Sequence, residues 1–118
     1  MIAFFKRLLG LDQPSLNNLS PNEALAKVKQ GAIILDVRSP LERQALSIPG
    51  SKTIPLDELA NKLETLPKGK EIICQCASGM RSARAARALA AQGFTVHNLS
   101  GGIQAWQQAG LPVKKGSA

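Results

Sequence analysis

The chain has 118 residues, of which 44% are hydrophobic and 19% charged, and its formal net charge is +7. That length fits one domain with its own core, and an aromatic content of only 3% leaves the core to aliphatic side chains. Two cysteines two positions apart exclude the disulfide framework of a small secreted protein, and no CxxC pair or histidine cluster indicates a metal. We expect a cytoplasmic protein without a metal or other cofactor.

No stretch approaches the roughly 20 apolar residues that span a bilayer, so we expect no integral membrane association. The positive charge is unevenly distributed, because no acidic residue follows Glu71. A basic chain often binds nucleic acid, but this one has no nucleic-acid motif and no run of stacking aromatic side chains. Three arginines instead adjoin a cysteine-containing loop, which favours a small anionic ligand and no nucleic acid.

Three segments differ in composition. Residues 1–14 form an apolar and basic extension that lacks the charge order and the cleavage site of a signal peptide. We expect a short amphipathic helix there, packed on its own domain, with a membrane surface or a partner protein as the alternative. Residues 15–113 form the single domain, and we expect residues 114–118 to be a disordered tail.

Helix caps and helix breakers divide the domain into short elements. Two capping boxes, at 20–23 and 39–42, place proline at the first helical position, and glycines or prolines follow the helix ends. In chain order the sequence predicts a helix over 21–29, a strand over 32–37, a helix over 40–46, a strand over 53–54, an amphipathic helix over 56–66, a strand over 71–75, a helix over 82–92, a strand over 94–98 and a helix over 103–109. This alternation indicates a parallel sheet with helices on both faces.

The most informative residue is Cys76, which follows the strand predicted over 71–75. Ligands of open parallel sheets bind at the carboxyl ends of the strands, where this cysteine lies. The residues after it are small, polar or cationic, and we expect them to bind substrate: Ala77, Ser78, Gly79, Met80, Arg81 and Ser82. Converging backbone N–H groups, the start of the next helix and the Arg81 guanidinium all favour a thiolate. We therefore predict that Cys76 is the catalytic nucleophile.

Cys74 and His97 are the other residues with reactive side chains near this chemistry. Cys74 lies two positions earlier in an apolar strand, where such neighbours are about 6.6 Å apart and poorly oriented for a disulfide. We expect Cys74 to pack in the core, with resolution of an oxidised Cys76 as the alternative. His97, the only histidine, belongs to another strand, and we expect it at a strand end on the surface rather than beside Cys76 as a base.

Several motifs, in their order along the chain, resemble the rhodanese family of thiosulfate sulfurtransferases. The resemblance covers about 15–113 and rests on Asp36-Val37-Arg38-Ser39-Pro40, Ile48-Pro49-Gly50-Ser51, Ile54-Pro55-Leu56, the Cys76 loop, Leu99-Ser100-Gly101-Gly102-Ile103 and Gly110-Leu111-Pro112-Val113. It implies a rhodanese-like three-layer α/β/α domain with a central, mainly parallel sheet of about five strands. Leu46 and Ser47 depart from the family pattern, which has glycine and histidine there, and Arg43 stands where an aromatic residue is common.

The resemblance also implies a ping-pong reaction. The Cys76 thiolate attacks the outer sulfur of a donor such as thiosulfate and keeps it as a persulfide, which a thiophilic acceptor then removes. We expect Arg81 to hold the sulfonate of the donor, and Asp36 and Arg38 to support the site as ion-pairing residues. A partner protein is a further candidate for the donor or the acceptor.

Two alternatives accompany this prediction. In one, the domain is a persulfide carrier or adaptor that acts with a protein partner. In the other, it is a phosphatase or arsenate reductase, whose loops resemble Cys-x5-Arg. Only four residues separate Cys76 from Arg81, and this tighter ring fits a sulfur atom better than a tetrahedral phosphate. We therefore favour sulfur transfer.

Overall fold

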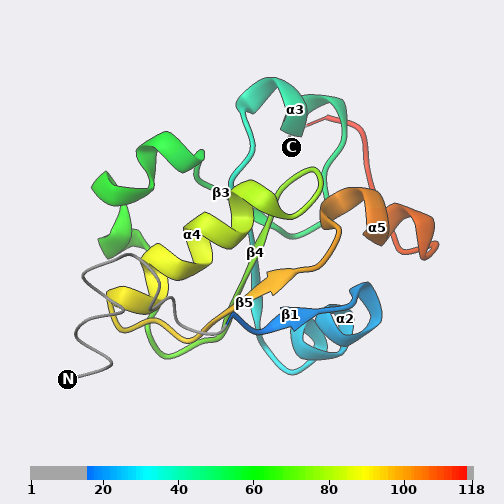
Figure 1. Cartoon of the computed structure of the whole chain (residues 1–118). Helices are drawn as coiled ribbons and strands as arrows, with labels where there is room; N and C mark the ends of the chain where they lie inside the picture. The colour runs from blue at the N-terminus through cyan, green and yellow to red at the C-terminus, as the bar shows by residue number, and fades with distance from the viewer. Residues whose placement is uncertain (1–15, 117–118) are drawn as a thin grey trace.

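The computed structural model of the chain describes residues 16–116 (Figure 1). Five strands form one parallel sheet in the order β1-β5-β4-β2-β3. The strands are β1 (Asn18–Leu19), β2 (Ile33–Asp36), β3 (Lys52–Thr53), β4 (Ile72–Gln75) and β5 (Val96–Leu99). The helices are α2 (Pro21–Lys29), α3 (Pro40–Ala45), α4 (Met80–Ala91) and α5 (Gly102–Gln108), with the 3-10 helices η1 (Leu56–Asn61) and η2 (Leu63–Thr65). The predicted α/β fold class is confirmed.

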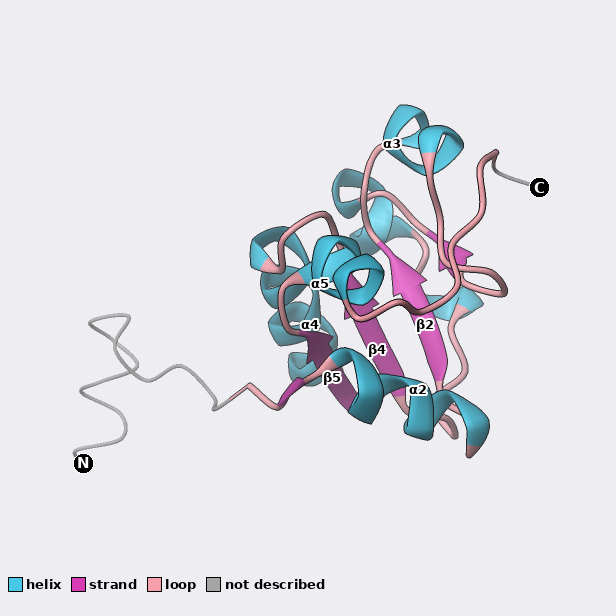
Figure 2. Cartoon of the chain, turned by 90° about the vertical axis from the view of Figure 1, so that its right-hand side faces the viewer, coloured by secondary structure: helices cyan, strands magenta, loops and turns pink. Residues whose placement is uncertain are grey.

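Two hydrophobic clusters lie on opposite faces of the sheet. Figure 2 shows the helices that cover these faces, with α2 and α5 on one side of the strands and α4 on the other. Successive side chains of a strand point to opposite faces, so Ile72 and Cys74 pack against α4 and η1 while Ile73 packs against α2 and α5. All three side chains are fully buried. The sheet is therefore the middle of three layers, and its strands all end at the same edge.

The predicted helix starts agree closely with the structure. Ser20 and Ser39 each accept a hydrogen bond from the backbone of the glutamate three residues later, and both capping boxes are complete. α4 begins at Met80, two residues before the predicted start. β1 was not predicted, because a strand of two residues is too short to show an alternating pattern.

The segment 56–66 corrects the prediction of one amphipathic helix, because it forms η1 and η2 instead. The backbone N–H of Glu58 donates to the Pro55 carbonyl at 2.9 Å, and that of Leu66 to the Leu63 carbonyl at 3.1 Å. The four leucines that indicated a helix come in two pairs three residues apart. That spacing suits the three residues per turn of a 3-10 helix as well as it suits an α-helix.

The start of the predicted disordered tail is bound to the domain. Lys114 forms an antiparallel bridge with Ser47, and the backbone N–H of Gly116 donates to the Gln44 carbonyl at 2.8 Å. The expectation of disorder is therefore wrong for residues 114–116, because these backbone groups pair with the end of α3 and the turn after it. Residues 117–118 and the predicted extension 1–14 lie outside the described residues. Within residues 16–116, no helix has the length and apolar composition needed to cross a membrane.

Candidate active site

Cys76 is the first residue after β4, in the loop that leads into α4. Its side chain is buried on the α4 face of the sheet, with 1% of its surface exposed. The backbone N–H of Gly79 donates to the sulfur at 3.1 Å, and the Ser82 hydroxyl oxygen lies 3.3 Å from it. The loop therefore curls around the sulfur and presents hydrogen-bond donors to it.

These hydrogen-bond donors lower the pKa of the Cys76 thiol. Burial by itself raises the pKa of Cys76, because a low-dielectric environment disfavours the thiolate. The hydroxyl and backbone N–H of Ser82, and the backbone N–H groups of Gly79 and Ser78, act in the opposite direction and outweigh burial. The pKa of Cys76 consequently lies below its usual range, which favours the nucleophilic form near neutral pH.

The Ser82 hydroxyl has one hydrogen and two acceptors. Asn98 Oδ1 lies 2.6 Å from the Ser82 oxygen, closer than the Cys76 sulfur does. The hydroxyl serves one of them at a time, so the backbone N–H groups are the constant part of the thiolate's stabilisation. The Asn98 amide nitrogen also donates to the Gly79 carbonyl at 3.2 Å and to Asn18 Oδ1 at 3.0 Å. Asn98 thus connects the loop to β5 and β1, a role that the sequence did not indicate.

The start of α5 determines which way the loop's peptide groups face. The backbone N–H of Ile103 donates to the Cys76 carbonyl at 2.9 Å, and that of Gln104 to the Ala77 carbonyl at 3.3 Å. Gly102 has a φ of +62°, and a Cβ atom there would lie 2.4 Å from the Ala77 oxygen. Only glycine permits this approach. With its carbonyls bonded to α5, the loop directs its N–H groups toward the sulfur.

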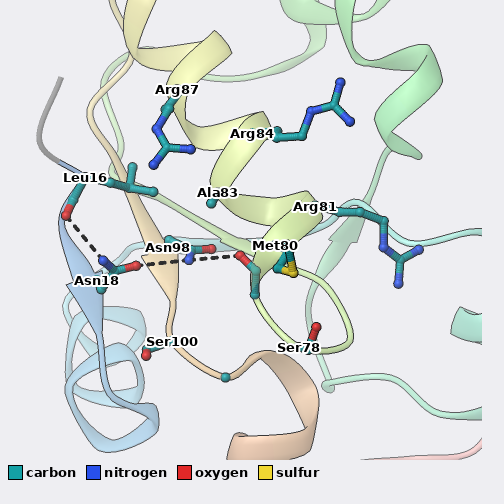
Figure 3. Close-up of a pocket in the computed structure, with 12 residues that line it drawn as sticks. Leu16, Asn18, Ser78, Met80, Arg81, Ala83, Arg84, Arg87, Asn98 and Ser100 are labelled. Carbon is teal, nitrogen blue, oxygen red and sulfur yellow. Dashed lines mark hydrogen bonds between the residues drawn. The ribbon is translucent and has the colours of Figure 1, made fainter. Parts of the chain in front are cut away.

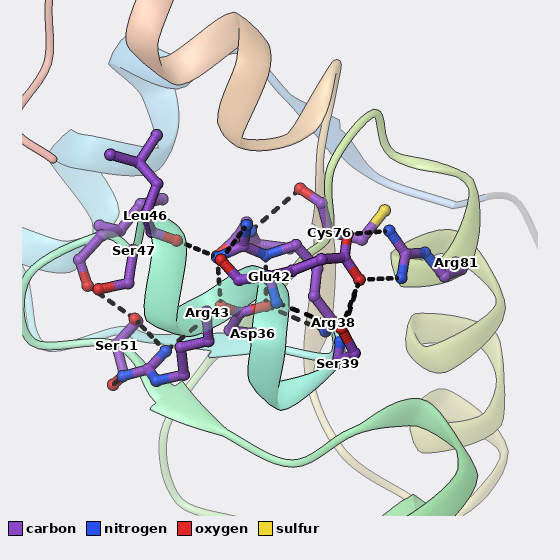
Figure 4. A network of polar contacts seen from close by, with 12 residues as sticks. Asp36, Arg38, Ser39, Glu42, Arg43, Leu46, Ser47, Ser51, Cys76 and Arg81 are labelled. Atoms are coloured by element: carbon purple, nitrogen blue, oxygen red, sulfur yellow. Dashed lines mark hydrogen bonds and ion pairs between the residues drawn. The ribbon is translucent and has the colours of Figure 1, made fainter. Parts of the chain in front are cut away.

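Arg81 lies in the first turn of α4 and forms a two-pronged ion pair with Glu42 of α3 (Figure 4). Both nitrogen–oxygen distances are 2.8 Å. The hydrogen bonds from Arg81 lower the pKa of Glu42 to about 2, and Glu42 raises the pKa of Arg81. The predicted contact between Arg81 and the donor anion stays a prediction. The guanidinium instead joins α3 to the Cys76 loop through Glu42, a partner 39 residues earlier that the sequence did not identify.

Asp36, at the end of β2, is fully buried and shared by two arginines (Figure 4). Arg38 binds both carboxylate oxygens, at 3.0 and 2.8 Å, and an Arg43 nitrogen lies 3.3 Å from Oδ2. Arg38 also donates to the Leu46 carbonyl at 2.6 Å, and Arg43 to the Ser51 carbonyl at 2.7 Å. The expected pairing of Asp36 with Arg38 is present. Arg43 adds a second charge to it and fixes the turn after α3.

The structure separates Cys74 and His97 from the loop chemistry. Cys74 is fully buried in the core, and desolvation, followed by the nearby Cys76 charge, raises its pKa to about 12. His97 is 6% exposed, so the expected surface position is wrong. Its ring nitrogens contact Glu71 Oε1 at 2.5 Å and the Asn17 amide at 2.6 Å. Those partners, rather than Cys76, orient the imidazole.

Comparisons with known proteins agree with this fold. A family model described as a rhodanese-like domain matches residues 20–109. A sulfurtransferase of Allochromatium vinosum is 34% identical over 85 residues, which cover 71% of this chain and 79% of that protein. The thiosulfate sulfurtransferase GlpE of Pseudomonas fluorescens is 33% identical over 90 residues, covering 75% of this chain and 83% of its own length. The crystal structure of a rhodanese-related protein from Thermoplasma volcanium has a TM-score of 0.79 at 35% identity, covering 83% of this chain and 97% of that chain.

Proposed function

Because this chain belongs to the family of rhodanese-like domains, we propose that it is a sulfurtransferase that carries sulfane sulfur as a persulfide on Cys76. We further propose thiosulfate or a similar anion as the donor, the substrate named in relatives such as GlpE. The observation that supports the proposal most directly is the Cys76 sulfur, which is buried yet has a lowered pKa because loop donors point at it.

The first half-reaction uses the thiolate as the nucleophile. The Cys76 sulfur attacks the outer sulfur of thiosulfate, the sulfur–sulfur bond of the donor breaks, and sulfite leaves with the bonding electrons. A new sulfur–sulfur bond remains on Cys76. No side chain has to remove a proton, because the N–H groups around the loop stabilise the thiolate before the donor arrives and the persulfide anion afterwards.

The second half-reaction restores the thiolate. A thiophilic acceptor attacks the terminal sulfur of the persulfide, and the Cys76 sulfur leaves as a thiolate into the same ring of donors. The loop therefore stabilises the reactant of the first step and the leaving group of the second. Cyanide serves as a test acceptor, since it takes up one sulfur to give thiocyanate.

The test is intact mass spectrometry after incubation with thiosulfate, followed by a thiocyanate assay with cyanide. We expect the protein to gain one sulfur, Cys76→Ser to gain none, and Cys74→Ala to gain one as the wild type does. Cys74→Ala is the matched control because it removes the other thiol and leaves the loop intact. Loading of the Cys76→Ser variant, or of neither wild type nor Cys74→Ala, would contradict the proposal.

The same experiment separates the two alternatives. A carrier that depends on a protein partner loads sulfur on Cys76 but transfers it to cyanide only at the background rate. A phosphatase hydrolyses p-nitrophenyl phosphate in a Cys76-dependent reaction and gains no sulfur from thiosulfate. The proposal predicts Cys76-dependent thiocyanate formation and no Cys76-dependent phosphate release.

A further inference from the structure

A groove of about 710 Å³ adjoins the Cys76 loop and extends along α4 toward β1 (Figure 3). Ser78 and Met80 of the loop line one end, and Arg84 and Arg87 of α4 also line the groove. In Figure 3, Arg87 lies on the side of α4 that faces Asn18 of β1, whereas the Arg84 side chain extends away from β1, where it also lines a second cavity. This volume is typical of a site for a small organic molecule. It is much larger than a single sulfonate group requires.

Two arginines of this groove have no partner among the described residues. Neither Arg84 nor Arg87 forms an ion pair or a hydrogen bond with any residue in 16–116, whereas Arg81 of the same helix is paired with Glu42. Arg87 Nε is a buried donor that meets no acceptor in the described chain. A buried donor without an acceptor is unfavourable, so the groove is suited to an anion that this part of the protein does not supply.

The position of these charges restricts the size of the anion. With a rise of 1.5 Å per residue, Arg84 and Arg87 lie roughly 6 and 10 Å along the helix axis from Met80, at the loop end. Anionic groups held at these two positions along α4 therefore lie farther from the loop than the reacting sulfur does. Met80 is 78% exposed and gives the loop end of the groove an apolar rim for the hydrocarbon part of a longer molecule.

We propose that this groove binds an extended organic persulfide through carboxylates that lie far from its sulfur, with Arg84 and Arg87 as the contacts that hold them. The inference rests on the proposed sulfur transfer by Cys76. A carboxylate bound by arginine in a partly buried site forms charge-assisted hydrogen bonds, which are stronger than neutral ones. The two arginines therefore select donors by the anionic end, while the loop acts on the sulfur.

The transfer balances without any further reactant. The Cys76 thiolate attacks the terminal sulfur of the persulfide R–S–SH, and the sulfur–sulfur bond of the donor breaks. The bonding electrons leave with R–S⁻, and Cys76 becomes Cys–S–SH, with the proton still on the transferred sulfur. One sulfur–sulfur bond forms as another breaks, so the step needs no oxidant and no reductant.

The test compares glutathione persulfide, which carries two carboxylates on a tripeptide, with thiosulfate as the donor. We expect Arg84→Gln/Arg87→Gln to lower the ratio of kcat/KM for glutathione persulfide to kcat/KM for thiosulfate by about 10- to 100-fold. Lys70→Gln, which removes one charge before the amino end of β4, is the control and leaves the ratio as in the wild type. An equal loss for both donors, or no change in the ratio, overturns the proposal.

A binding measurement separates this inference from the proposed function. Titration calorimetry of Cys76→Ser with S-methylglutathione needs no sulfur transfer. We expect binding that weakens about 10-fold or more for the dimethyl ester of this ligand and for the variant that also carries the two arginine substitutions. Binding of this kind supports carboxylate recognition by the groove even if no sulfur loads on Cys76. Equal binding of the acid and the ester, or no binding while thiosulfate still loads Cys76, overturns the proposed recognition by the groove and leaves the proposed function intact.

Discussion

Strand β4 and the loop that follows it contain the two cysteines of the chain, and the pKa values of the two thiols are shifted in opposite directions. Cys74 and Cys76 pack in the same hydrophobic cluster and are almost completely buried. Burial raises the pKa of Cys74 to about 12, whereas the pKa of Cys76 is lowered. The two residues therefore differ in the hydrogen-bond donors that face the sulfur rather than in exposure to water.

The difference arises from the backbone. Cys74 lies in the middle of the sheet, where it pairs with Leu35 of β2 and Asn98 of β5, so the peptide groups around it bond to neighbouring strands. The loop after β4 has no such neighbours. α5 bonds its carbonyls, and its N–H groups are left to converge on the Cys76 sulfur. The Cys76 thiol is activated because it lies where β4 ends and its loop begins, so that backbone N–H groups are available to it.

The largest effect on the difference between Cys76 and Cys74 is expected from Gly102→Ala, which disturbs the loop around Cys76. The added Cβ would lie 2.4 Å from the Ala77 oxygen, in a residue with a φ of +62°. We expect the loop to shift, sulfur loading to slow at least about 10-fold, and the free energy of unfolding to fall by about 2–4 kcal/mol from backbone strain and overpacking. Loading kinetics by mass spectrometry and urea unfolding measure both.

Gly110→Ala is the matched control for that substitution. Gly110 has a φ of +77°, but nothing lies within 4 Å of a Cβ built there. We expect a loss of about 1 kcal/mol from strain alone and normal sulfur loading. If the two variants behave alike, contact between α5 and the loop does not orient the loop's N–H groups.

The next effect is expected from Ser82→Ala, which removes the side-chain donor 3.3 Å from the Cys76 sulfur. We expect the pKa of Cys76 to rise, because a hydrogen bond that stabilises the thiolate is lost. Ser78→Ala is the control, since Ser78 acts on the sulfur through its backbone N–H. The pH dependence of alkylation measures the shift, and an equal shift in both variants would argue against a role for the Ser82 hydroxyl.

A smaller effect is expected from Glu42→Gln, which breaks the ion pair with Arg81. The folded pKa of Glu42, about 2, lies below the unfolded value of about 4.3, so its stabilising contribution is present above the unfolded value and is lost as the pH falls toward 2. Because the two side chains are 35% and 40% exposed, we expect the pair to contribute at most about 1 kcal/mol.

Urea unfolding near neutral pH and at about pH 3 measures this contribution. Glu42→Gln should be less stable than the wild type at neutral pH and nearly as stable in acid. Glu58→Gln, which breaks the exposed pair with Lys62, is the control and should change stability less. A Glu42→Gln deficit that is the same at both pH values would show that the charge of Glu42 is not what stabilises the pair.

The smallest effect on sulfur transfer is expected from Cys74→Ala. The substitution leaves a small cavity beneath α4, and we expect it to lower the free energy of unfolding by about 1 kcal/mol. Loading of Cys76 should proceed at the wild-type rate. A large fall in loading would mean that Cys74 takes part in the chemistry, the alternative that its buried position disfavours.

The sequence could predict features that depend on neighbouring residues. The capping boxes at Ser20 and Ser39, and the small residues after Cys76, are local signals, and the structure bears out the elements that they indicate. The carboxyl end of β4 follows from the alternation of strands and helices. The fold class and the position of the candidate nucleophile were therefore accessible without coordinates.

The features that the sequence could not indicate depend on partners distant along the chain. Arg81 was expected to hold the sulfonate of the donor, which stays a prediction, but its ion pair with Glu42 from another helix had no signal in the sequence. Asn98 was predicted only as the last residue of a strand, although its side chain hydrogen-bonds to Gly79 of the loop and to Asn18 of β1. Arg43 pairs with Asp36 seven residues earlier, across the turn between β2 and α3. None of these contacts leaves a periodic or capping signal.

The contrast between the two thiols is tested most directly by the pH dependence of Cys76 alkylation. In Cys74→Ala, the remaining thiol is Cys76, and the rate of its reaction with iodoacetamide reports the fraction of thiolate. We expect a half-maximal rate at a pH below the usual cysteine value of about 8.5. A half-maximal rate at or above that value would contradict it, because burial would then outweigh the donors of the loop.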